Sequence, residues 1–228
     1  MTSRQTCVHH LSPNHDIRRT AGVDMLVLHY TGMRSGPEAL DRLLDPDTQV
    51  SAHYLVDEDG TTHHLVPESR RAWHAGKSCW RGEADVNSRS IGVEIVNPGH
   101  EFGYRPFPEV QIQAVIRLCL GIVSRHSITA RNVVGHSDVA PTRKQDPGEL
   151  FPWAQLKGYG LGLWPFTGDE RAVPEPEAVP GLLAAYGYDV SDPAAAIAAF
   201  QRHFRPERID GVADGETLAR LQRLLAAV

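Results

Sequence analysis

One loop of the sequence carries residue types that could hold a metal ion. In the stretch VVGHSDVAPTRKQDPGELFPW, His136 and Asp146 stand ten residues apart, with two prolines and a glycine close by. These turn-forming residues bend the chain and can return the carboxylate to the imidazole. Imidazole nitrogen and carboxylate oxygen are ligands of borderline divalent ions such as zinc. The loop therefore predicts two ligands of a metal site.

A catalytic zinc site commonly has three protein ligands and one position for water. The candidate for the third ligand is His29, which stands at the end of the apolar run MLVLHYT. A strand that ends in histidine delivers the imidazole to the rim of a sheet. Taken alone, a histidine at a strand end is more often a hydrogen-bonded structural residue. Together with the loop, it predicts a Zn²⁺ site of His29, His136 and Asp146.

Two further residues are candidates for catalytic groups. Glu94 lies among small and apolar residues in the strand-like run SIGVEIV, and a carboxyl group there must be paired or functional to offset its desolvation. We expect it to act as the general base. Lys144 precedes Asp146 by two residues on the same loop and can stabilise an oxyanion. The adjacent Arg143 is better interpreted as a solvated surface charge.

The sequence resembles the type 2 N-acetylmuramoyl-L-alanine amidases, zinc enzymes that share a fold with peptidoglycan recognition proteins. Five segments carry this resemblance, in the family's order and within residues 20 to 165: LVLHYT, SAHYLVDEDG, AWHAG, SIGVEIVN and GHSDVAPTRKQDPG. The resemblance implies that His29, His136 and Asp146 bind zinc. It also implies a catalytic Glu at position 94 and a catalytic Lys at position 144.

The remaining motif positions are assigned to the substrate. The segment AWHAG mixes small and aromatic residues, as a ligand-lining loop does, although core aromatics are commoner. We expect Trp73 and Asn97 to contact substrate. His53 and His74 belong in the substrate cleft or in supporting hydrogen bonds rather than on the metal.

Three functions remain open at this level. The first is hydrolysis of the amide bond between N-acetylmuramic or 1,6-anhydro-N-acetylmuramic acid and L-alanine, in intact peptidoglycan or in soluble muropeptides that are being recycled. The second is a non-catalytic peptidoglycan recognition protein. The third is a stem-peptide peptidase, because a fold alone does not fix the scissile bond. Retention of the three ligands, Glu94 and Lys144 favours the amidase.

Composition excludes some partners. A formal net charge of −5 argues against a nucleic-acid surface, which is usually basic. No stretch reaches the length of a membrane span, and the N-terminal 22 residues have no apolar core of a secretory signal. The three cysteines, Cys7, Cys79 and Cys119, are odd in number and predict free thiols, with Cys119 in the core. We expect a cytoplasmic monomer, or a periplasmic protein if a leader precedes this sequence.

The pattern of apolar residues predicts an α/β fold with a mixed sheet flanked by helices. After an irregular polar arm that ends at Gly22, we expect strands at residues 24–30, 51–56, 61–66, 90–96 and 132–135. The second and third of these should form a hairpin. Helices are expected at residues 35–44 and 110–127.

A change of composition divides the chain. We expect a catalytic domain at residues 1–164, a linker rich in proline and glutamate at residues 165–180, and a three-helix domain at residues 181–228. The last segment resembles the peptidoglycan-binding modules of cell-wall hydrolases, or is a helical bundle that only caps the catalytic domain. Its small size favours docking onto the catalytic domain. On this view, deletion of residues 172–228 should not selectively impair cleavage of polymeric wall.

Overall fold

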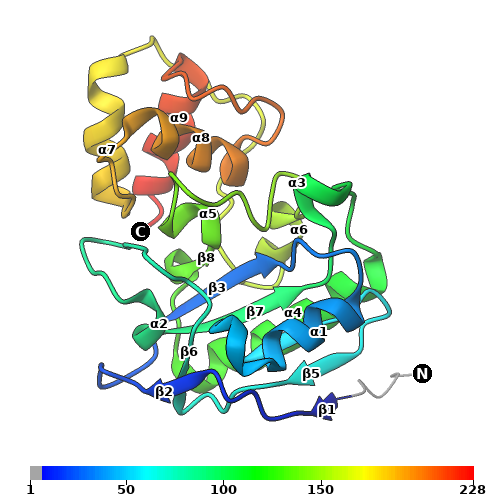
Figure 1. The fold of residues 1–228 in the computed structure, drawn as a ribbon. Coiled ribbons are helices and arrows are strands. Elements are labelled where there is room, and N and C mark those ends of the chain that lie inside the picture. The colour runs from blue at the N-terminus through cyan, green and yellow to red at the C-terminus, as the bar shows by residue number, and fades with distance from the viewer. Residues whose placement is uncertain (1–6) are drawn as a thin grey trace.

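The computed structural model describes residues 7–228 and contains a six-stranded mixed sheet, a two-stranded sheet and flanking helices (Figure 1). The strands are β1 (Cys7–His9), β2 (His15–Ile17), β3 (Met25–Tyr30), β4 (Tyr54–Val56), β5 (Thr62–His64), β6 (Arg70–Ala72), β7 (Ser90–Ile95) and β8 (Val133–Gly135). The helices are α1 (Gly36–Leu44), α2 (Val86–Arg89), α3 (Gly99–Phe102), α4 (Glu109–His126), α5 (His136–Val139), α6 (Trp153–Lys157), α7 (Val179–Tyr186), α8 (Pro193–Phe204) and α9 (Gly215–Leu225). Short 3₁₀ turns lie at Pro46–Thr48, Ala130–Asn132 and Pro176–Ala178. The predicted mixed α/β class is confirmed.

The order of the large sheet is β1-β5-β4-β7-β3-β8, and β3 pairs in parallel with both β7 and β8. In this register His29 lies opposite Glu94, and Leu28 lies opposite Gly135, the residue before His136. Because the carboxyl ends of neighbouring parallel strands meet at one edge of a sheet, the three functional candidates come together there. The sheet register alone therefore brings His29, Glu94 and His136 to one edge of the sheet.

One face of the sheet is covered by α4. Leu26 and Leu28 of β3 and Val93 of β7 are fully buried against it, together with Ile116 and Cys119 of the helix. Burial of each large apolar side chain contributes about 1.5–3 kcal/mol. The alternate residues of β3 and β7 must therefore face the other side, and these include His29 and Glu94.

Two separate groups of helices pack on the other face of the sheet. Helix α1 packs Ala39 and Leu43 on the β4 and β5 side of the sheet. Helices α7, α8 and α9, called the C-terminal helices below, form one continuous buried cluster with side chains of β3, β8 and the 75–86 segment. That cluster includes Met25, Val27 and Phe200. The C-terminal helices thus complete the core of the sheet, which confirms the expected docking.

The helices expected at residues 35–44 and 110–127 are present as α1 and α4, and the expected three-helix segment is present as α7, α8 and α9, whereas the short helices α2, α3, α5 and α6 were not expected. Ser35, Asp192 and Asp214 are N-caps whose side chains accept hydrogen bonds from backbone N–H groups of α1, α8 and α9. The predicted hairpin is also present as the antiparallel pair β4 and β5.

The expectation of an irregular N-terminal arm was wrong in part. Its residues 1–6 lie outside the described part of the chain, but β1 pairs with β5 and β2 pairs with β6. Each of these strands has only three residues and mixes histidine or aspartate with apolar residues. Such strands carry no periodic signal, because pairing with an existing strand edge forms them.

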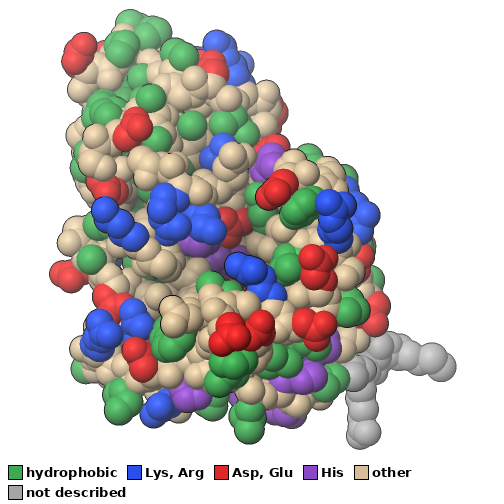
Figure 2. All heavy atoms as spheres, viewed as in Figure 1, with side chains coloured by type: hydrophobic (Ala, Val, Ile, Leu, Met, Phe, Trp, Pro, Cys, Tyr) green, Lys and Arg blue, Asp and Glu red, His purple; other side chains and the backbone are tan. Residues whose placement is uncertain are grey.

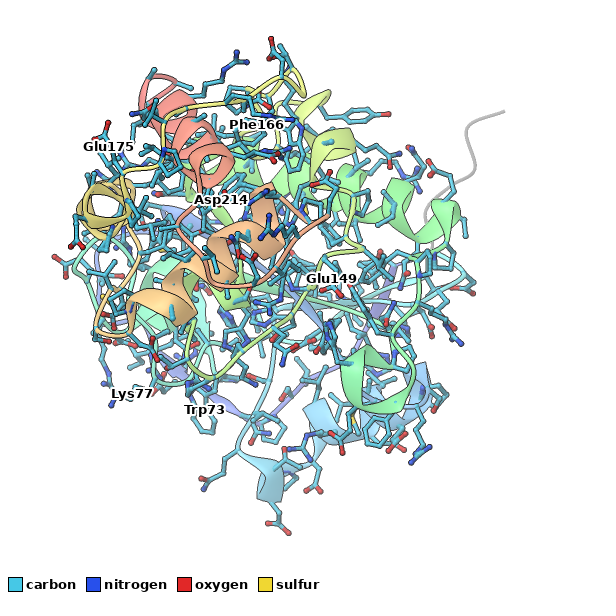
Figure 3. The ribbon with its side chains drawn as sticks, turned by 90° about the horizontal axis from the view of Figure 1, so that it is seen from above. Trp73, Lys77, Glu149, Phe166, Glu175 and Asp214 are labelled. Atoms are coloured by element: carbon cyan, nitrogen blue, oxygen red, sulfur yellow. The ribbon has the colours of Figure 1, made fainter. Side chains whose placement is uncertain are left out.

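The segment predicted as a linker packs closely on the C-terminal helices. It has no helix or strand before Pro176, but Ala172 N donates to Gly215 O at 3.1 Å. Phe166 lies beside α9 in Figure 3, and the Arg220 guanidinium is 5.1 Å from its ring centroid. The domain limits stay a prediction, while the segment itself is held in place. Within residues 7–228 no helix combines the length and the apolar character needed to cross a membrane.

Candidate metal centre and active-site cleft

The three predicted ligands converge on one point. His29 Nδ1 lies 2.9 Å from His136 Nδ1 and 3.0 Å from Asp146 Oδ2, and His136 Nδ1 lies 2.9 Å from the same oxygen. All three residues are buried. Within residues 7–228 this is the one group of three His, Cys, Asp or Glu residues whose ligand atoms lie close enough to share an ion.

The fold explains how residues far apart in sequence meet. His29 lies near the end of β3, and His136 is the first residue of α5, directly after β8. The loop then returns, so that Ser137 N donates to Asp146 O at 2.9 Å. A Cβ atom on Gly135 would lie 2.7 Å from Pro147 Cδ, so the loop packs directly on a glycine. The bent loop predicted from the prolines is therefore what positions Asp146.

The protonation of His136 follows from its second nitrogen. His136 Nε2 lies 3.1 Å from Ala75 O, and a carbonyl oxygen can only accept a hydrogen bond. Nε2 of His136 must therefore carry the proton. In a neutral imidazole this leaves a lone pair on Nδ1, directed at the other two ligands.

A chain of hydrogen bonds fixes His29 in the same way. Ser90 Oγ donates to Val86 O at 2.6 Å and so accepts from His74 Nε2 at 3.1 Å. His74 Nδ1 then carries a lone pair and accepts from His29 Nε2, 3.0 Å away. The His74 ring lies over Gly92, where a Cβ atom would come within 2.4 Å of it. Nδ1 of His29 is thereby left as an acceptor.

Two imidazole nitrogens and one carboxylate oxygen thus face one another. Burial lowers the pKa of His29 to about 4, which keeps this imidazole neutral at neutral pH. Burial opposes ionisation of Asp146, but the two imidazoles outweigh it and hold the pKa of this carboxyl well below its usual range. Two imidazole nitrogens and a carboxylate oxygen that meet at one buried point are ligand types of zinc, so the residues present fit a divalent metal ion.

Glu94 faces the same side of the sheet as His29. Its Oε2 is buried and has no hydrogen-bond partner among residues 7–228. Burial raises the pKa of Glu94 well above its ordinary value, and the nearby charge of Asp146 raises it further, whereas Lys144 lowers it. An unpartnered carboxyl group with a raised pKa, beside a metal site, is suited to accept and release a proton.

A cleft of about 690 Å³ opens above these residues, between α1 and the 143–146 loop. Figure 2 shows a hollow near the middle of this face, with Lys and Arg side chains around His, Asp and Glu. The described residues that line the cleft include Glu94, His136, Lys144 and Asp146, and also Trp73 and His74. Figure 3 shows Trp73 near the edge of the molecule, outside the C-terminal helices.

His53 and Asn97 lie outside this lining. His53 is fully buried; its Nδ1 accepts from Gly92 N at 3.0 Å, and its Nε2 donates to Arg70 O at 3.1 Å. Asn97 donates from its amide to Arg105 O at 2.7 Å and accepts from Gly99 N at 3.0 Å. Both side chains are hydrogen-bonded to the backbone, and His53 Nε2 also lies 2.9 Å from the Arg18 guanidinium. For His53 this matches the supporting hydrogen bonds expected as one of its two roles, and for both it gives no support to substrate contact.

Sequence reasoning missed several supporting groups. Arg143 is exposed, as a surface charge should be, but it also donates to Ala75 O at 2.9 Å and to Lys77 O at 2.6 Å, so it holds the carbonyl that orients His136. Ser90 orients His74 and gave no signal beyond its place at the start of a strand. Arg42 of α1 lines the cleft, and only its place on the helix face that meets the cleft could have indicated it.

Comparison with known proteins decides the family. The family model for N-acetylmuramoyl-L-alanine amidase matches residues 19–149, more than half of the chain, and spans all the candidate ligands and Glu94. The chain belongs to this family. A second model, for a peptidoglycan binding domain, matches residues 177–221, which contain most of the C-terminal helices.

Individual amidases are similar over most of their length. The chain is 41% identical to N-acetylmuramoyl-L-alanine amidase AmiD of Escherichia coli over 89% of this chain and 82% of that protein. It is 32% identical to 1,6-anhydro-N-acetylmuramyl-L-alanine amidase AmpD of Enterobacter cloacae over 64% of this chain and 85% of that one. The solved complex of E. coli AmiD with anhydro-N-acetylmuramic acid-L-Ala-D-γ-Glu-L-Lys has a TM-score of 0.82 and 40% identity, covering 92% of this chain and 91% of the other.

Proposed function

We propose that this amidase is a zinc hydrolase that cleaves the amide bond between the lactyl group of N-acetylmuramic acid, or its 1,6-anhydro form, and L-alanine, in cell-wall turnover and recycling. The observation that carries the proposal is the convergence of His29 Nδ1, His136 Nδ1 and Asp146 Oδ2, which lie 2.9–3.0 Å from one another. Because the chain belongs to the N-acetylmuramoyl-L-alanine amidase family, we assign hydrolysis of this amide bond to the site.

Each cleft residue has a role in this reaction. Zinc, when bound, supplies a Lewis acid and lowers the pKa of its water. Glu94, with its raised pKa, takes a proton from the attacking water and gives it to the departing amine. Lys144 lines the cleft and offers a positive charge to the oxyanion that forms on the substrate carbonyl. His74 holds His29 in the tautomer that binds metal.

We propose a soluble muropeptide as the preferred substrate. AmiD and a Pseudomonas aeruginosa relative, AmpDh3, have both been solved with anhydromuramic peptides, and the AmpDh3 complex has a TM-score of 0.79 and 35% identity to this chain. A cleft of about 690 Å³ is in the usual range of small-ligand sites. The exposed part of Trp73 offers an apolar ring face on which a sugar can pack.

Zinc content tests the proposed ligand set. His29→Ala, His136→Ala and Asp146→Ala should each lose both zinc and activity, because each removes one of three protein ligands. Glu94→Gln is the matched control, since it should keep stoichiometric zinc while losing proton transfer. A ligand variant that retains one zinc per chain would remove that residue from the set.

A non-catalytic binder and a stem-peptide peptidase are the competing functions. A binder needs no proton-transfer group, whereas Glu94 retains an unpartnered carboxyl oxygen beside the ligands. The amidase and the peptidase cleave different bonds, so the products of the reaction distinguish them.

We also propose a cytoplasmic monomer. Cys7, Cys79 and Cys119 are all free thiols, as expected, and Cys119 is buried in the core. Free cysteines suit a reducing compartment. Fractionation of the native full-length protein into the periplasm would overturn the assignment, and a molecular mass near 25.1 kDa in solution would support the monomer.

A further inference from the structure

The carboxyl group of Asp138 forms hydrogen bonds that connect the chain before residue 165, called the catalytic lobe below, to the segment that contains the C-terminal helices. It is 1% exposed and accepts three hydrogen bonds within the described residues. One comes from Gly135 N at 2.7 Å, within its own loop. The other two come from Tyr188 Oη at 2.7 Å and from His203 Nδ1 at 2.7 Å, both beyond residue 164.

This carboxyl group is close to the metal centre through the backbone. Gly135 immediately precedes His136, and Asp138 lies two residues after it in the single turn α5. The bond from Gly135 N to Asp138 Oδ2 closes this turn around His136. The Asp138 carboxyl group is therefore hydrogen-bonded directly to the backbone that precedes a proposed metal ligand.

The two remote donors are themselves held firmly. The His203 ring stacks on Trp153 with centroids 3.8 Å apart, and it is 3% exposed. The Tyr188 ring packs edge-on against Trp80 at 5.4 Å, and it is also 3% exposed. Trp80 and Trp153 belong to the catalytic lobe, so both donors are fixed by interdomain packing and not by the C-terminal helices alone.

We propose that Tyr188 and His203 are positioning residues of the amidase reaction, which set the orientation of His136 through Asp138. The C-terminal helices would then be part of the metal centre's support, in addition to any contact with peptidoglycan. The inference rests on the proposed zinc site. It also means that deletion of residues 172–228 removes both donors and uncovers the sheet, so deletion cannot isolate a role in wall binding.

The test removes the two donors and keeps an aromatic ring at each position. In full-length protein, Tyr188→Phe combined with His203→Phe leaves Asp138 with Gly135 N alone. Tyr186→Phe is the matched control, because it removes a hydroxyl from the same buried cluster and its ring contacts Tyr188, but no hydrogen bond joins it to Asp138. The measurements are zinc affinity by chelator competition and the visible absorption spectrum of the Co²⁺-substituted protein.

We expect the double variant to bind zinc about 10-fold or more weakly, as for other residues that orient metal ligands. Its cobalt spectrum should shift, and kcat should fall at saturating zinc with little change in KM. His203→Asn, which keeps an N–H near the position of Nδ1, should restore affinity relative to His203→Phe. A purely structural role would lower the melting temperature and leave zinc affinity and the cobalt spectrum equal to those of Tyr186→Phe, which would overturn the proposal.

Two further arms separate the possible failures. If the double variant does not fold, Tyr188→Phe decides alone, and unchanged zinc affinity and cobalt spectrum in it would overturn the proposal. If wild-type protein binds zinc no better than His136→Ala, the metal-site proposal fails first and this inference fails with it. Normal zinc binding by wild type with an unaffected double variant refutes only the positioning role.

Discussion

Glu94→Gln should separate catalysis from stability. The change keeps the volume of the side chain and removes its ability to carry a proton. Turnover of zinc-saturated enzyme on an anhydro-muropeptide should fall by roughly 10²–10⁴. Glu94 Oε2 is buried without a partner, and burial together with Asp146 raises the pKa of this carboxyl. The charged group therefore costs folding free energy in the metal-free protein.

The size and pH dependence of this cost can be worked out. A buried polar group without a partner costs about 1–3 kcal/mol, and Glu94 is partly open to the cleft, so we take about 1–2 kcal/mol. For a chain of this size that corresponds to about 2–8 °C in melting temperature. Because the folded pKa is raised, the cost is absent below the unfolded value near pH 4.3 and grows as the pH rises above it.

The assay is thermal unfolding of chelator-treated protein from pH 4 to pH 8, beside turnover of the zinc-loaded form. Glu94→Gln should equal wild type near pH 4 and exceed it at pH 7–8. Glu177→Gln, which removes an exposed carboxyl group, should change neither quantity. Near-wild-type turnover of Glu94→Gln would remove Glu94 as the base, and a lower melting temperature at pH 7 would refute the electrostatic reasoning.

Three other predictions concern residues around the site and the core. Burial raises the pKa of Glu68, but its hydrogen bonds lower it to about 2, so Glu68→Gln should lose about 1–2 kcal/mol at pH 7. In pH-dependent denaturation this difference should fade as the pH drops from about 4.5 through about 2. Leu183→Ala, at a fully buried site on α7, should cost about 2–5 kcal/mol in urea unfolding, and a loss below 1 kcal/mol would argue against a shared core. His74→Phe should weaken zinc binding about 10–100-fold in chelator competition, and unchanged affinity would exclude its orienting role.

The elements of the site could be predicted from sequence because the local signals are strong. The apolar run before His29 and the alternating pattern around Glu94 both specify strands, and β3 and β7 place these two residues in register. The prolines around Asp146 specify the bent loop. These signals are short-range, and parallel pairing converts them into one edge of a sheet.

The supporting contacts could not be predicted, since they depend on tertiary packing. The bond from His203 to Asp138 joins residues 65 positions apart, and neither carries a local pattern. Asn97 lies in a motif typical of the family, yet its side-chain amide is hydrogen-bonded to the backbone of Arg105 and Gly99. A motif position therefore does not tell a substrate contact from a structural hydrogen bond.

The most direct test of the central claim is mass spectrometry of the products from one defined substrate, an anhydro-N-acetylmuramyl peptide, treated with zinc-loaded enzyme. The zinc amidase predicts two products only, the intact anhydro sugar and the complete stem peptide with a free L-alanine amine. Chelation should abolish both products, and added zinc should restore them. Shortened stem peptides still attached to the sugar would contradict the proposed bond, and unchanged substrate with fully zinc-loaded protein would contradict catalysis.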